Sequence, residues 1–205
     1  MNHISHETKQ KIEKAIFEVE KKTSSELIAV VTEKSGEYLY ISLLLTSLAS
    51  LLIPFGLLFF APDMEAKSIY EAQLLGFMLF MVLFNVPKVL FYLLPKSVFV
   101  KAAKFKAYET FRILGLQKTR NYQAVMIFVS LYEQYIEIIA DSAISAKIDN
   151  ALWQSMIDAF VEKVKNEAFE EGYLQAINEV GALLVHHFPI EKEDKNELSN
   201  GLIEV

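Results

Sequence analysis

The sequence contains no cysteine. Disulfide bonds, thiolate metal sites and a cysteine nucleophile are therefore excluded, although this absence does not fix the compartment. Three patterns that carry common chemistries are also missing: a glycine-rich phosphate loop, an HExxH zinc motif and a GxSxG nucleophile elbow. Ser130 stands inside a strand pattern with no paired base, so a serine hydrolase is not expected.

The chain also lacks an excess of positive charge. Its 20 basic and 26 acidic residues give a formal net charge of −6, which argues against a nucleic-acid partner held by phosphate attraction. Residues 1–22 are charged and amphipathic and lack the apolar core of a signal peptide, so we expect them to stay in the cytoplasm. What the chain has in excess is hydrophobic residues, which make up 53% of it, and we expect part of them to face lipid.

Two long apolar runs predict a pair of transmembrane helices. Residues 38–61 carry no formal charge, and at about 1.5 Å per residue a helix of this length crosses the roughly 30 Å hydrocarbon layer. Residues 72–94 are long enough as well, but Pro87 should kink that helix and Lys88 should reach toward the nearer interface. The alternative is a pair of buried core helices in a soluble protein.

The distribution of Lys and Arg predicts the orientation of these spans. Residues 62–71 form a short connector with a single lysine, whereas six lysines precede the first span and several lysines and arginines follow the second. This bias places the connector outside and both termini in the cytoplasm, as in an integral protein of the inner membrane. Asn85 and Lys88 are the strongly polar candidates within the spans, and so few polar groups favour anchoring over a transporter or channel role.

The two arms together predict one discontinuous α/β domain, residues 1–37 plus 97–189. A 40-residue arm cannot bury its own apolar strand, so that strand needs partners from beyond the spans. The hydrophobic periodicities predict, in order, a helix at 5–22, a strand at 27–31, a helix at 97–114 ended by Gly115, strands at 125–131 and 135–140, and two final helices. Residues 190–205 are expected to be an acidic tail without structure.

Asp141 is the first candidate functional residue, because it directly follows the predicted β-hairpin. A turn centred on Glu133 would place Asp141 opposite Val125, beside the loop that carries Thr119 and Arg120. These side chains could hold a divalent cation through oxygen ligands, or a phosphate through Arg120. The alternative is that Asp141 caps the helix or turn that follows and the loop residues stabilise their loop.

The ordered set of segments resembles the TPM domain family, named for a thylakoid lumen protein, a photosystem II repair protein and a nematode receptor modulator. The segments that carry the resemblance are AIFEVEKKTSSELIAVVTEKSGEY, FRILGLQKTRNYQAVMIFVSLYEQYIEIIADSAI and LWQSMIDAF with EGYLQAINEVGALLVHHFP. It extends over residues 8–189 and is nearest to the short bacterial membrane proteins in which a transmembrane pair interrupts the domain. The resemblance implies an α/β class fold, a three-layer α/β/α sandwich interrupted by a two-helix transmembrane hairpin.

The resemblance also implies a set of site residues. By position Glu26 matches an acidic residue at the entry to the first strand, Thr119 a threonine of the loop before the second strand, and Asp141 the aspartate after the hairpin. Some members of the family are described as acid phosphatases, some bind calcium through acidic residues, and others serve in membrane-complex assembly or repair. The sequence departs from the family pattern at Ser25, Ala124, Gln134, Ser142 and Ala143.

Two functions follow from these observations. The expected one is a membrane-anchored, non-catalytic interaction or assembly module, with the lipid bilayer and a membrane protein as partners and no certain cofactor. The alternative is a divalent-metal-dependent hydrolase like an acid phosphatase, with Ca²⁺ or Mg²⁺ held by Asp141 and Glu26 and the phosphate oriented by Arg120. The departures from the family pattern remove a glycine and an arginine near this site and so favour the first function.

Overall fold

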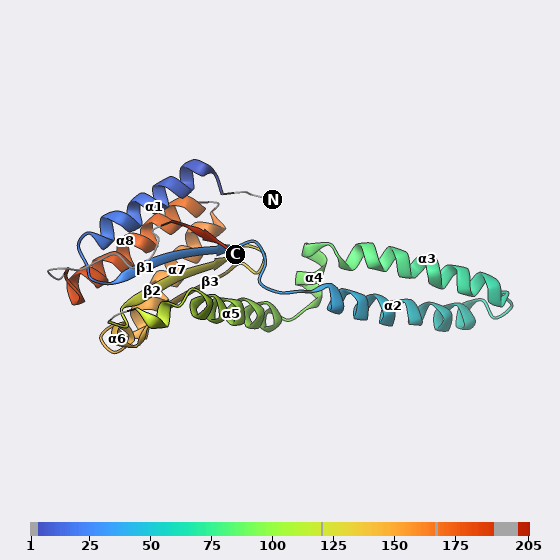
Figure 1. Ribbon diagram of the computed structural model, residues 1–205. Helices are drawn as coiled ribbons and strands as arrows, with labels where there is room; N and C mark the ends of the chain where they lie inside the picture. The colour runs from blue at the N-terminus through green and yellow to red at the C-terminus, as the bar shows by residue number, and fades with distance from the viewer. Residues whose placement is uncertain (1–3, 120, 167, 191–200) are drawn as a thin grey trace. The chain divides into compact units, whose positions relative to one another are not determined.

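The computed structural model describes residues 4–119, 121–166, 168–190 and 201–205, without the side chain of Lys165. The chain divides into two compact units. One unit contains Met1–Ser35 together with Ala102–Val205, and the other contains Gly36–Lys101. The first unit is an α/β domain and the second is a helical hairpin (Figure 1).

A four-stranded mixed sheet forms the centre of the α/β domain. Its order is β3 (Tyr135–Ala140), β2 (Ala124–Ser130), β1 (Glu26–Thr32) and β4 (Ile203–Glu204). β1 runs parallel to both β2 and β4, whereas β3 is antiparallel to β2. Every residue of β1 and β2 is buried, as their continuous apolar runs predict for central strands covered on both faces.

Helices cover both faces of the sheet and make three layers (Figure 1). α1 (His6–Glu20), α7 (Asn150–Lys165) and α8 (Phe169–His187) pack on one face, whereas α5 (Lys96–Ile113) and the 3₁₀ turn η1 (Leu116–Lys118) pack on the other. Alternate residues of β1 separate the two cores: Leu27, Ala29 and Val31 belong to the first, and Ile28 and Val30 to the second. The three-layer α/β/α class expected from the sequence is confirmed.

The register of the β2–β3 hairpin differs by one residue from our expectation. Ser130 pairs with Tyr135 and Val125 pairs with Ala140, so the loop has four residues and Asp141 is level with Ala124 rather than Val125. The side chain of Glu133 explains the longer loop, because it is buried and accepts the Ser35 N–H at 3.0 and 3.1 Å. Glu133 is thus held inside the fold by its side chain and does not form the tip of a symmetric turn.

The second unit contains the two apolar helices. α2 (Leu39–Phe60) and α3 (Ala66–Phe84) have 22 and 19 residues and are long and apolar enough to cross a membrane. The helix expected at 72–94 begins six residues earlier, at Ala66, and stops at Phe84, and the chain continues in α4 (Pro87–Leu93). Proline explains the break: Pro87 is the first residue of α4, and Val86 before it is extended.

Part of the tail that we expected to lack structure is a strand. Ile203 and Glu204 form β4 on the open edge of β1, and the Val205 N–H donates to the Val31 carbonyl at 3.1 Å. The Thr32 hydroxyl donates to the Val205 carbonyl at 2.6 Å. These bonds satisfy edge groups that β1 would otherwise present to solvent. Residues 191–200 of the predicted tail lie outside the described part of the chain.

Candidate functional site

The register of the sheet brings the two predicted acidic ligands to one end of it. Glu26 is paired with Ala124 in the parallel ladder, and Asp141 follows Ala140 on the other side of β2. The Asp141 N–H donates to the Ala124 carbonyl at 2.9 Å, which continues the ladder to this row. Two strand spacings separate the Glu26 and Asp141 backbones by about 10 Å.

Both acidic side chains lie over the face that α5 and η1 cover. Residues that are level across a ladder point to the same side of the sheet, and Ala124 belongs to the core under α5. Ala124 stands between Glu26 and Asp141 in this row of the sheet. The structure therefore places both at one sheet end and on one face, which the sequence alone did not show.

Asp141 is a helix cap, as the alternative interpretation predicts. Its Oδ1 accepts the Ser142 N–H at 2.6 Å, and the residue is the N-cap of the short helix α6 (Ser142–Ser145). Its Oδ2 is buried and has no hydrogen-bond partner among the described residues. One oxygen is therefore used by the fold, and the other is the atom that a ligand would have to satisfy.

The remaining predicted residues have different positions. Glu26 is 9% exposed, and its N–H donates to the Gln123 carbonyl at 2.9 Å. Thr119 is buried, and its hydroxyl donates within the loop to the Leu116 carbonyl at 3.4 Å. Thr119 thus stabilises the loop that follows η1. Arg120 lies outside the described residues, so its predicted role in orienting phosphate stays a prediction.

One unpartnered oxygen in η1, which packs on this face of the sheet, was not predicted. Oε1 of Gln117, in η1, is buried without a hydrogen-bond partner in the described part of the chain. An amide oxygen is a ligand that Ca²⁺ accepts, and the two carboxylates would be the charged ligands. No group of three or more His, Cys, Asp or Glu residues suited to a metal ion occurs among the described residues. A cation here would therefore need this amide or water to complete its coordination.

The backbone at this sheet end is already occupied by hydrogen bonds. The Glu26 N–H binds the Gln123 carbonyl, and the Ala143 N–H binds the Tyr122 carbonyl at 3.3 Å. Anion sites in phosphate-binding proteins use such N–H groups. The backbone N–H groups that join these loops are thus used to hold them together.

A second polar cluster, which sequence reasoning missed, lies at the opposite end of the sheet. Glu133 is 7% exposed and accepts hydrogen bonds from the Ser35 N–H and the Ser130 hydroxyl. The hydroxyls of Ser35 and Ser130 are 2.7 Å apart. The buried Glu133 carboxylate accepts hydrogen bonds from both serines. It therefore fastens the β2–β3 loop to Ser35, in the segment that follows β1.

The third candidate is a groove of about 780 Å³ between α1 and α8. Its lining contains the small residues Ala15, Gly181 and Ala182 and the basic residues Lys11, Lys14 and Lys22. A Cβ atom on Gly181 would lie 2.4 Å from a methyl group of Val19. Gly181 is therefore needed for the close packing of α1 on α8, which gives the glycine in this groove a structural explanation.

Comparisons with known proteins agree with this fold. A family model described as the TPM domain matches residues 97–183. The NMR structure of the BA42 protein from the psychrophilic bacterium Bizionia argentinensis is similar, with a TM-score of 0.62 and 19% sequence identity over 100% of this chain and 97% of that one. At this identity the likeness shows the fold alone. No curated protein matches the chain. The family resemblance stated from the sequence is confirmed.

Proposed function

Because this chain carries a TPM domain and two apolar helices interrupt its α/β fold, we propose that it is a membrane-anchored interaction or assembly module. Its α/β domain works at the cytoplasmic face of the inner membrane, without catalysis. Its partners are the lipid bilayer and a membrane protein.

The burial pattern of α2, with polar residues buried and apolar residues exposed, supports this proposal most strongly. The buried residues of α2 are Ser42, Thr46 and Ser50, spaced one helical turn apart, and α2 packs against α3. Its large apolar residues point outward, with Leu52 69% and Phe55 75% exposed. Water-soluble helices bury the opposite set, whereas membrane helices pack through small polar residues and expose their apolar ones to lipid.

Two further contacts fit a membrane hairpin. The Ser42 hydroxyl donates to the Phe84 carbonyl at 3.0 Å, which satisfies polar groups within the helix pair. Gly76 of α3 faces Ile53 of α2 so closely that a Cβ atom there would lie 2.1 Å from the end of the Ile53 side chain. At about 1.5 Å per residue, α2 and α3 are about 33 and 29 Å long, close to the thickness of the hydrocarbon layer.

We propose no catalysis because several groups of the predicted site already form hydrogen bonds within the fold. Asp141 uses one carboxylate oxygen to cap α6. Thr119 donates to its own loop, and the backbone N–H groups of Glu26 and Ala143 are used between loops. A phosphate site needs free N–H groups and positive charge, and the sequence departs from its family at Ser25 and Ala124 in this region.

The absence of cysteine makes the anchor and its orientation testable with single-cysteine variants. Asp63→Cys lies in the connector between α2 and α3, and Ser155→Cys lies on the exposed side of α7. We expect a membrane-impermeant maleimide to label Asp63→Cys in intact cells and Ser155→Cys only after permeabilisation. Both variants should stay in the membrane pellet after carbonate extraction.

The unaltered cysteine-free chain is the control for background labelling. Recovery of the protein in the carbonate supernatant would contradict anchoring. Labelling of Ser155→Cys in intact cells would contradict the cytoplasmic orientation and leave the anchor in place.

A divalent-metal-dependent phosphatase is the second candidate function. It is supported by the alignment of Glu26 and Asp141 on one face and by the unpartnered Oδ2 of Asp141. In this reading Glu26 and Asp141 hold Ca²⁺ or Mg²⁺, which would supply an activated water for hydrolysis. Arg120 would orient the phosphate.

Release of phosphate from p-nitrophenyl phosphate by the detergent-purified chain separates the two functions. Asp141→Asn keeps a capping side chain but removes the charge, and Asp149→Asn at the N-cap of α7 is the matched control. We expect no turnover with either metal in any of the three proteins. Metal-dependent turnover that is lost in Asp141→Asn and retained in Asp149→Asn would establish the hydrolase instead.

A further inference from the structure

α5 has a basic and aromatic outer face that no part of the described chain covers. This face, called the α5 outer face below, consists of Lys101, Lys104, Phe105, Tyr108, Arg112 and Ile113, with one exposed acidic residue, Glu109, among them. Phe105 is 72% exposed, Ile113 74% and Tyr108 47%. Large apolar side chains grouped on a helix and surrounded by cations are typical of a surface that contacts something else.

The other side of α5 explains why the α5 outer face must point away from the sheet. Ala103, Ala107 and Phe111 are buried, and the last two pack on Ile28 and Val30 of β1 and on β2. Since these buried positions repeat every four residues, the helix cannot rotate without losing its core contacts. Phe105 and Ile113 therefore stay exposed to whatever lies outside the domain.

The cations of the α5 outer face are available to an external anion. No acidic partner is recorded for Lys101, Lys104 or Arg112 among the described residues, whereas Lys106 is 3.7 Å from Glu109. The ammonium group of Lys104 lies 5.9 Å from the ring centre of Tyr108. The chain as a whole has a net charge of −6, so this local surplus of positive charge runs against the overall balance.

We infer that the α5 outer face lies on an anionic lipid surface, with its cations at the headgroups and Phe105 and Ile113 in the interfacial layer. Continuity of the chain selects this occupant. α4 ends at Leu93 and α5 begins at Lys96, so only two residues separate these helices, and the two helix ends lie at most about 11 Å apart. The first turns of α5 therefore stay with the membrane unit. The inference rests on the proposed membrane anchor and adds the lipid class that its domain recognises.

The chemistry of the face fits a bilayer surface. Lysine and arginine side chains can extend toward phosphate groups while their aliphatic parts stay in contact with acyl chains. Aromatic rings with one polar end, such as Tyr108, are favoured at the level of the headgroups. An anionic lipid satisfies both the charge and the apolar area, whereas a zwitterionic lipid does not neutralise the cations.

Nitroxide labels on single-cysteine variants of the full chain in nanodiscs test this inference. Phe105→Cys reports on the α5 outer face, and Leu152→Cys is a matched exposed position on α7, which covers the other face of the sheet. Phe55→Cys on α2 reports on the hairpin itself. Accessibility of each label to oxygen and to a water-soluble nickel complex is measured in phosphatidylcholine with and without phosphatidylglycerol.

We expect the nickel accessibility of the Phe105→Cys label to fall several-fold when phosphatidylglycerol is present, with a rise in oxygen accessibility. Leu152→Cys should stay water-exposed in both lipids. Replacing Lys101, Lys104 and Arg112 by glutamine should restore water exposure at position 105. All the changes lie at exposed positions, and circular dichroism checks that the domain stays folded.

The label on α2 separates failure of the inference from failure of the anchor. A Phe105→Cys label that behaves like Leu152→Cys in both lipids, while Phe55→Cys lies in lipid, overturns the inference alone. A Phe55→Cys label exposed to water overturns the anchor as well. Exclusion of both oxygen and nickel at position 105 indicates a protein contact between copies and also overturns the inference.

Discussion

Tyr173 links several elements of the α/β core. It is fully buried, and its hydroxyl donates to the Val30 carbonyl at 2.9 Å and lies 3.2 Å from the Ile127 carbonyl. Its ring packs edge-on against Phe160 and Phe169, with centroid distances of 5.6 and 5.4 Å. α8 is thereby fastened to β1 and β2 through one phenol, which must stay protonated to donate.

Tyr173→Phe should lower stability and change its dependence on alkaline pH. Loss of one buried hydrogen bond should cost about 1 kcal/mol at neutral pH. Burial raises the pKa of Tyr173 above its usual value near 10. The folded chain therefore keeps a proton that the unfolded chain loses, and stability falls above pH 10 by about 1.4 kcal/mol per pH unit.

Urea unfolding in detergent, followed by the fluorescence of the single, buried Trp153, measures this effect. The variant should show a shallower loss of stability between pH 10 and 11. Some slope should remain, because burial and the neighbouring Glu137 raise the pKa of Tyr135. Identical alkaline slopes in the two proteins would show that the Tyr173 phenol is not what opposes ionisation.

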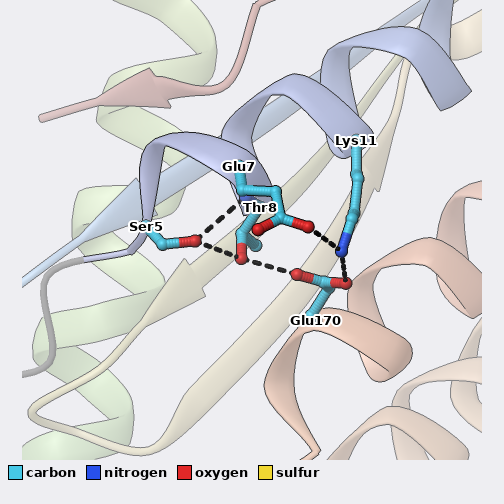
Figure 2. Close-up of polar contacts among 5 residues, drawn as sticks. All are labelled: Ser5, Glu7, Thr8, Lys11 and Glu170. Carbon is cyan, nitrogen blue, oxygen red and sulfur yellow. Dashed lines mark hydrogen bonds and ion pairs between the residues drawn. The ribbon is translucent and has the colours of Figure 1, made fainter.

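At the scale of elements, the start of α1 depends on α8 (Figure 2). Ser5 caps α1 by accepting the Thr8 N–H at 3.0 Å, and the Thr8 hydroxyl donates to Glu170 at 2.6 Å. Lys11 lies 2.8 Å from Glu170 and 2.9 Å from Glu7. One carboxylate at the first turn of α8 therefore holds the first two turns of α1.

Glu170→Ala should loosen the first turn of α1 without unfolding the domain. Hydrogen bonds from Lys11 and then Thr8 lower the pKa of Glu170, so the contact is present above the usual carboxyl pKa and is lost as the pH falls. We expect amide hydrogens of residues 8–12 to exchange several-fold faster at neutral pH. Hydrogen-exchange mass spectrometry of a peptide from this region measures the change.

Glu171→Ala is the matched control, since Glu171 lies 3.3 Å from Lys163 of α7 and forms no ion pair with α1 among the described residues. It should leave the exchange of residues 8–12 unchanged. Equal exchange in the Glu170 variant and the parent chain would show that apolar packing of Ile12 and Ile16 alone holds this end of α1.

At the scale of the whole molecule, the chain contains two units with opposite patterns of burial: one buries apolar side chains, and the other buries small polar ones. The α/β domain buries its continuous apolar strands. The hairpin buries Ser42, Thr46 and Ser50 and exposes leucine and phenylalanine. Both patterns occur in one chain because the hairpin is inserted between β1 and α5, which pack against each other in the core of the α/β domain.

Most elements could be predicted because their signals are local. The long uncharged run of α2, the apolar runs of β1 and β2, and the four-residue periodicity of α7 each depend only on residues that are close in sequence. Gly115 as the end of α5 follows from one residue, and its φ of 71° agrees with that expectation. The break at Val86–Pro87 was expected only as a kink, because proline signals a disruption without its geometry.

The candidate site was predictable in its residues and not in its arrangement. Asp141 was identified by its place after a hairpin, but its alignment with Glu26 needed the exact register, which depends on the distant contact of Glu133 with Ser35. The unpartnered oxygen of Gln117 had no sequence signal. Side-chain contacts between residues far apart in the chain determine both features.

By itself, the sequence determined the α/β class, the two apolar helices and the capacity of Asp141 to cap a helix, because these depend on local composition and periodicity. Only the tertiary structure decided that Glu26 and Asp141 share a face, that Ile203 and Glu204 complete the sheet, and that Phe105 points outward from α5. These features depend on which strand edges and helix faces are already covered, and that is a property of the assembled layers.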